Sequence, residues 1–188
     1  AKIPEPDFVR LTTQAPWKDY VAVPPANETS SFFMNTEMKP FDDRRVRQAL
    51  NYAVDKERLI RLLNGRGRVA HGVIPPAMTG YDPNLRGYPY DPARARTLLR
   101  EAGYPQGFTV PIFIGSASRS LKLAQAVQQD LLAVGVRLEL QAVAGSVAGQ
   151  AYRKRRNVPM GIQTWYMDYP DPGNFLDTFL NGEHITDE

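Results

Sequence analysis

The chain has 188 residues, of which 43% are hydrophobic and 23% charged, a composition typical of a globular protein with one sizeable core or two small ones. No apolar run approaches the ~20 residues of a membrane-spanning helix. The absence of cysteine excludes disulfides and thiolate chemistry, and the net charge of +3 demands neither a nucleic-acid partner nor an anionic membrane. Because Ala1 is not an initiator methionine, we expect a processed or excised fragment, which leaves an exported origin open.

The first half of the chain predicts one strand and two helices after a proline-rich start. Residues 1–29 are expected to lead into the fold, with an edge strand at most. Residues 30–36 predict a short aromatic strand. A helix with one apolar face follows, and Asp55 is expected to cap a second helix that ends at Gly65. The apolar face of the first helix comprises Val46, Ala49, Leu50, Ala53 and Val54.

The middle of the chain predicts a long loop and then a βαβ unit. Residues 65–90 are rich in glycine and proline, and a connection of this length is often functional. Asp91-Pro92 predicts the start of a helix that stops at Gly103. Strands at 108–114 and 136–140 flank a helix at 118–134, so we expect them to be parallel with a right-handed crossover. Pro111 places the first of these strands at or near a sheet edge.

The end of the chain carries the most informative stretch, Trp165 to Pro172. It follows a strand at 160–164, after a weaker helix at 145–156, and Asp171-Pro172 predicts the start of a last helix. The order of elements is α/β throughout and favours one domain. Open α/β sheets bind ligands at the carboxyl ends of their strands, where this stretch lies. Spacing alone favours the alternative of a structural loop whose aromatics cover the core.

Asp168 is the carboxylate of this stretch that the helix start does not use. Among the rings of Trp165, Tyr166 and Tyr169 it is better suited to holding a cation than to catalysis. Desolvation by the rings would strengthen a hydrogen bond to an ammonium group, and the ring faces would add cation–π attraction. The pattern predicts an amine site.

Other classes of function have less support in the sequence. A hydrolase using Asp168 and Asp171 would need both carboxylates free, and capping by Asp171 removes one. His71 and His184 lie far apart and outside any metal-ligand spacing, so we expect no metal and no cofactor. The basic run 153–156 complements a helix dipole more readily than it binds phosphates, so we expect no nucleic acid.

Several motifs occur together in one order along residues 17–182, and with them the chain resembles the extracellular solute-binding proteins of peptide and nickel ABC importers, the dipeptide- and oligopeptide-binding group. These motifs are Phe33-Met34-Asn35-Thr36, Pro40 to Asp55, Pro75-Pro76, Gly80-Tyr81-Asp82, Tyr90-Asp91-Pro92, Leu98 to Pro105 and Trp165 to Pro172.

The resemblance implies a periplasmic-binding-protein-like α/β lobe, with a mixed, mostly parallel sheet flanked by helices. Such proteins are not enzymes but monomeric two-lobed receptors, which close around a ligand and deliver it to an ABC permease in the membrane. Residues 1–188 would be the carboxyl-terminal ligand-binding lobe, without the partner lobe of the same protein. The implied location is periplasmic or extracellular, with a lipoprotein anchor on the full-length protein left open.

The resemblance also implies roles for individual residues. In peptide-binding members an aspartate in a Trp-x-x-Asp-Tyr pattern holds the amino terminus of the ligand, and Asp168 matches it. The backbone from Thr164 to Tyr166 would pair with the main chain of the ligand, beside Trp165 and Tyr169. Relatives that bind sugars, nickel chelates or other small cationic solutes share the scaffold, so these ligands stay as alternatives. The group that binds the carboxylate of the ligand is not placed.

Overall fold

A single four-stranded sheet organises the chain. The computed structural model describes residues 3, 5–23 and 27–181. The strands are β1 (Glu28–Met34), β2 (Phe108–Gly115), β3 (Val136–Val143) and β4 (Met160–Tyr166), in the order β1-β4-β2-β3. β1 runs antiparallel to β4, whereas β2 is parallel to both β4 and β3. The sheet is mixed and mostly parallel, and the parallel pairing of β2 and β3 confirms the predicted βαβ unit.

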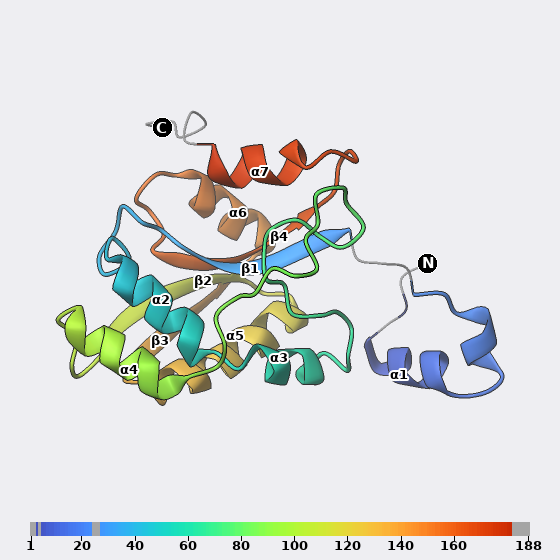
Figure 1. The fold of residues 1–188 in the computed structure, drawn as a ribbon, viewed down its shortest axis with the longest axis horizontal. Coiled ribbons are helices and arrows are strands. Elements are labelled where there is room, and N and C mark those ends of the chain that lie inside the picture. The colour runs from blue at the N-terminus through green and yellow to red at the C-terminus, as the bar shows by residue number, and fades with distance from the viewer. Residues whose placement is uncertain (1–2, 4, 24–26, 182–188) are drawn as a thin grey trace.

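Helices cover both faces of the sheet (Figure 1). On one side lie α6 and α7, and on the other α2, α3, α4 and α5, while α1 stands apart from the sheet. None of the helices within the described part of the chain is long and apolar enough to cross a membrane. The helices are α1 (Glu5–Thr13), α2 (Arg44–Ala53), α3 (Lys56–Leu62), α4 (Pro92–Glu101), α5 (Ser118–Leu132), α6 (Gly145–Arg153) and α7 (Gly173–Leu180), with a 3-10 turn η1 (Trp17–Tyr20).

Short acidic side chains start the helices where the sequence predicts it. The Asp55 carboxylate accepts a hydrogen bond from the backbone N–H of Arg58 at the start of α3. Asp91 does the same for Arg94 in α4, whose first residue is Pro92. Each carboxylate satisfies a backbone donor that has no partner inside the helix. These two predicted helix starts are confirmed.

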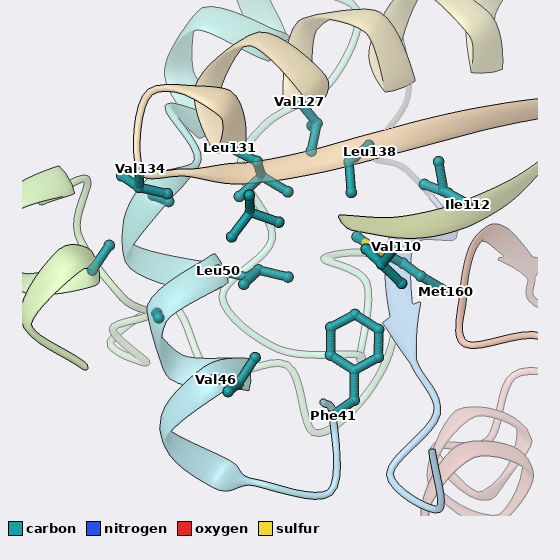
Figure 2. Close-up of a cluster of buried hydrophobic side chains, with 14 of the residues drawn as sticks. Phe41, Val46, Leu50, Val110, Ile112, Val127, Leu131, Val134, Leu138 and Met160 are labelled. Carbon is teal, nitrogen blue, oxygen red and sulfur yellow. The ribbon is translucent and has the colours of Figure 1, made fainter. Parts of the chain in front are cut away.

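The core fills the space between one face of the sheet and helices α2, α4 and α5. Figure 2 shows side chains from α2 facing side chains from α5 and the strands. Along β2, every second residue from Val110 to Ile114 is buried, because alternate residues of a strand point to the same face. The predicted apolar face of α2 is confirmed, with Val46, Ala49, Leu50 and Ala53 all buried.

The prediction that Pro111 places its strand at or near a sheet edge holds only in its weaker form, because β2 is not an edge strand but lies next to the edge strand β3. β2 lies between β3 and β4, and Pro111 is paired with Glu139 of β3. The register with β4 is set at Phe113 and Gly161, beyond the proline. A strand inside a sheet tolerates proline where a neighbour takes no hydrogen bond from that position.

Within residues 1–29 the described residues form α1 and η1, which the sequence did not predict, and Glu28 and Thr29 begin the edge strand β1. The described residues of this segment contribute none to the core cluster, and Tyr20 is exposed. The Arg66 guanidinium lies 4.9 Å from the centre of the Phe8 ring, a cation–π contact between α1 and the loop after α3. The first strand also begins and ends two residues earlier than predicted.

Candidate ligand-binding site

β4 extends beyond its parallel neighbour at the carboxyl edge of the sheet. Because Phe113 is level with Gly161, the last residue of β2, Gly115, is level with Gln163. The segment from Thr164 to Tyr166 therefore lies past the end of β2, although it is paired with β1 on its other side. This segment lies at the carboxyl ends of the strands, the usual place for ligands in open α/β sheets.

The pleat of β4 separates the aromatic residues that the sequence grouped around Asp168. Thr164 and Tyr166 share the face of Met160 and Ile162, and the Thr164 hydroxyl is 2.8 Å from that of Ser30 in β1. Trp165 points to the opposite face, because successive residues of a strand alternate. The expectation that the rings of Trp165 and Tyr166 lie together around Asp168 is wrong, because neighbouring residues of a strand point to opposite faces.

Asn174, in the first turn of α7, fixes the position of Asp168. Its side chain is 4% exposed, and its Oδ1 accepts hydrogen bonds from the indole Nε1 of Trp165 (3.3 Å) and the backbone N–H of Asp168 (3.0 Å). These two donors orient the amide, so Nδ2 faces Asp168 Oδ2 at 3.5 Å. One buried side chain thus joins the end of β4, the loop and α7.

Sequence reasoning missed Asn174. A short polar side chain in the first turn after a strand-to-helix loop can bond to the loop backbone, and this was the available signal. The motif Trp165 to Pro172 stops two residues short of it.

The carboxylate of Asp168 is exposed, as is Tyr169. The expectation that surrounding rings desolvate this carboxylate is therefore wrong for the described residues: Trp165 is turned toward Asn174 and Tyr166 lies on the other face. The loop backbone is fixed, and Asp168 has one carboxylate oxygen toward the Asn174 amide while the residue as a whole is exposed. Such an arrangement suits a charge-assisted hydrogen bond to a ligand.

Asp171 acts at the start of α7, one residue away from its predicted position. The helix begins at Gly173 with Pro172 as the capping residue, so the prediction of Asp171 as the cap itself is wrong by one residue. The Asp171 carboxylate nevertheless accepts a hydrogen bond from the backbone N–H of Gly173 at 2.7 Å. Its role at the helix start leaves the hydrolase alternative without a second free carboxylate.

The long loop lies against the same site. The Thr29 hydroxyl donates to the carbonyl of Val73 at 2.8 Å, and Thr29 is the cross-strand partner of Trp165. A Cβ placed on Gly80 would lie 3.5 Å from Pro172, which leads into α7. The loop therefore lies next to both ends of the Trp165–Pro172 stretch, beside Thr29 at one end and Pro172 at the other.

Arg153 of the basic run 153–156 lies in the last turn of α6, where a cation complements the helix dipole as expected, and Arg155 has a further structural role. α6 ends at Arg153, and the guanidinium of Arg155 donates to Glu37 with Nε 2.8 Å from Oε2. This hydrogen bond is the main reason that the pKa of Glu37 lies below its usual value. The pair joins the segment after β1 to the segment before β4.

Replacing Asn174 with alanine should remove the acceptor shared by Trp165 and the Asp168 backbone. We expect a loss of about 1–3 kcal/mol in the free energy of unfolding, the usual cost of leaving partly buried donors without a partner. Thermal unfolding of the full-length protein checks this. The matched control is Asn157→Ala, because Asn157 is exposed and donates to one carbonyl, that of Ala151. Equal melting temperatures for the two variants would contradict the role of Asn174.

Residues 2–187 match the family model described as "Bacterial extracellular solute-binding proteins, family 5 Middle". The chain belongs to this family. It is 38% identical over 160 residues to heme-binding protein A of Haemophilus influenzae. The aligned region covers 80% of this chain and 28% of that protein. Over 182 residues it is 35% identical to di/tripeptide-binding protein 2 of Pseudomonas aeruginosa, covering 94% of this chain and 34% of that one.

Solved structures agree with the family assignment. An ABC transporter-associated periplasmic binding protein from Helicobacter pylori, in complex with the peptide STSA, superimposes with a TM-score of 0.77 at 29% identity. The match covers 93% of this chain and 33% of that one. The fold is that of periplasmic binding proteins, as the resemblance implied, and the chain spans about a third of the length of the relatives it matches.

Proposed function

We propose that this chain is the ligand-binding lobe of a solute-binding protein of an ABC importer, and that Asp168 binds the amino terminus of a peptide. The observation that carries the proposal is the exposed Asp168 carboxylate at the carboxyl end of the sheet, on a backbone fixed by the buried Asn174. An ionised carboxylate only accepts hydrogen bonds and an ammonium group only donates them, so the two groups are complementary.

The β2 side of Thr164–Tyr166 would pair with the main chain of the peptide. Because β2 stops level with Gln163, a peptide in this position continues the line of β2 along β4. Backbone pairing gives affinity without reading side chains, and so suits peptides of mixed sequence. The amino terminus of such a peptide would lie near Asp168, just beyond the end of β4.

In the full-length protein a second lobe would cover this edge and complete the site. Closure would remove water from the Asp168 carboxylate, which strengthens its bond to the ligand. Trp165 and Tyr169 would then contact the ligand or the second lobe. The closed protein would deliver its peptide to the permease from the periplasm or the cell exterior, either free or as a lipoprotein.

A second candidate keeps the scaffold and changes the solute. The relative from Haemophilus influenzae is named a heme-binding protein and others a glutathione-binding protein, so the same scaffold serves more than one ligand class. A sugar, a nickel chelate or another small cationic solute would use the same crevice. The exposed carboxylate favours a ligand with an ammonium group over a neutral sugar.

A thermal-shift screen of the full-length protein separates these candidates. Ligands that bind the folded state raise the melting temperature in proportion to the logarithm of their concentration above Kd. We expect di- to pentapeptides with a free amino terminus to raise it. A rise with heme, a nickel chelate or a sugar, and none with any peptide, would overturn the proposal.

A further inference from the structure

The helical unit before β1, formed by α1 and η1, carries large apolar side chains on its surface. Tyr20 is 83% exposed and Trp17 is 49% exposed, and Val9 and Val23 are exposed as well. None of the four residues of η1 is buried. Soluble proteins rarely expose large apolar side chains in groups, and aromatic residues are enriched where proteins bind one another. The unit therefore has the composition of an interface.

The described part of the chain does not cover this surface. α1 packs against η1 and stands apart from the sheet (Figure 1), and the described residues before β1 add nothing to the core cluster. The contact between Arg66 and the Phe8 ring joins α1 to the loop after α3, but it leaves Trp17 and Tyr20 exposed. A partner for these two aromatic rings therefore has to come from outside the described residues.

The unit joins the lobe at the ligand-binding edge of the sheet. Asn27 lies one residue before β1, and its carbonyl accepts a hydrogen bond of 2.8 Å from the backbone N–H of Met167, which precedes Asp168. β1 then begins at Glu28, the cross-strand partner of Tyr166. The unit is therefore tethered to the same edge that the proposed second lobe would cover.

We infer that α1 and η1 form an interaction surface for the second lobe of the same protein, and that this lobe buries Trp17 and Tyr20. The inference rests on the proposed function, which supplies the second lobe. Because the chain spans about a third of the length of its relatives, such proteins contain enough further chain for that lobe. Both lobes belong to one chain, so their high effective concentration favours this contact over one with a separate molecule.

The charges of the segment favour a protein partner over an anionic membrane. Segments that lie on anionic lipids carry an excess of lysine and arginine. Residues 5–23 instead have a net charge of −1, from two cations and three carboxylates: Arg10 and Lys18, and Glu5, Asp7 and Asp19. Arg10 is also paired with Asp7 at 2.9 Å. The exposed rings are therefore suited to an apolar protein surface.

Hydroxyl-radical footprinting of the full-length protein, read by mass spectrometry, measures the exposure of individual tyrosines. Tyr90 is the reference, because it is 51% exposed just before α4, on the other side of the sheet from α7 (Figure 1). Tyr20 is more exposed than Tyr90 in this lobe, so it would be oxidised faster if nothing covered it. We expect Tyr20 to be oxidised about fivefold or more slowly than Tyr90, because the core of an interface excludes water.

A double substitution measures what the surface contributes. Trp17→Ala combined with Tyr20→Ala in the full-length protein should lower the melting temperature by about 5 °C or more, because two packed aromatic rings are lost. The control is Tyr90→Ala, which removes an exposed ring and should shift the melting temperature by no more than about 1 °C. An unchanged melting temperature in the double variant overturns the inference.

The outcomes of footprinting separate the inference from the function on which it rests. Oxidation of Tyr20 as fast as that of Tyr90 overturns the inference, while a rise in melting temperature with peptides still supports the proposed function. Protection of Tyr20 that appears only as the protein concentration rises means that a second copy covers it, which also overturns the inference. Protection at every concentration, without a thermal shift from any peptide, supports the contact between the lobes and overturns the peptide site.

Discussion

Replacing Asp168 with asparagine in the full-length protein should weaken binding of a peptide with a free amino terminus by about 1.5–3 kcal/mol, the usual contribution of a hydrogen bond to a charged group. This corresponds to roughly a 10- to 150-fold rise in Kd. Asparagine keeps the size of the side chain and the backbone bond to Asn174, so the change isolates the charge. Isothermal titration calorimetry measures it.

An acetylated peptide provides the control for this substitution. Acetylation removes the ammonium charge, so the wild type should bind the acetylated peptide as weakly as the variant binds the free one. The variant itself should discriminate little between the two peptides. If Asp168→Asn bound the free peptide as tightly as the wild type, the amine site would lie elsewhere.

Replacing Gly107 with alanine should have the largest effect on stability. Gly107 precedes β2 with a φ of +76°, and a Cβ there would lie 1.9 Å from the carbonyl oxygen of Gly135, which precedes β3. The new methyl group must push the starts of two paired strands apart. We expect a loss on the order of 3–5 kcal/mol in the free energy of unfolding, which combines the strain of a positive φ with backbone displacement.

Gly103→Ala is the matched control for Gly107→Ala. Gly103 follows α4 with a φ of +91°, but a Cβ there would have no neighbour within 4 Å. It should lose only ~1–2 kcal/mol from the strain of a left-handed conformation. Differential scanning calorimetry of the two full-length variants compares them, and equal losses would mean that the close approach of Gly107 to Gly135 does not limit stability.

Local features of the fold were predictable because they depend on residues close together in sequence. Asp55 and Asp91 could be assigned as helix caps from their position before an apolar helical pattern, and the structure agrees. Features that depend on tertiary neighbours were not predictable in the same way. Pro111 indicated a strand at or near an edge, and only the fold shows that β2 lies one strand inside it, with the register with β4 beyond the proline. In α7, Leu176 and Leu180 are 38% and 68% exposed, which an apolar helical pattern does not predict.

The sequence indicated candidate residues for a site but not their arrangement. Asp168 stood out as a carboxylate that no helix start uses, and the motif around it identified the family. Trp165 and Tyr166 point to opposite faces because the strand continues through Tyr166. Successive residues of a strand alternate between its faces, so this arrangement depends on where the strand ends. Asn174 lies two residues past the motif, and its hydrogen bonds with Trp165 and the Asp168 backbone are seen only in the folded chain.

A crystal structure of the full-length protein with a bound short peptide tests the central claim most directly. The account predicts that the amino nitrogen of the peptide lies about 3 Å from the Asp168 carboxylate, within charge-assisted hydrogen-bond distance. It also predicts main-chain hydrogen bonds between the peptide and Thr164–Tyr166. A peptide whose amino terminus lies against another residue, with Asp168 left in solvent, would contradict the account.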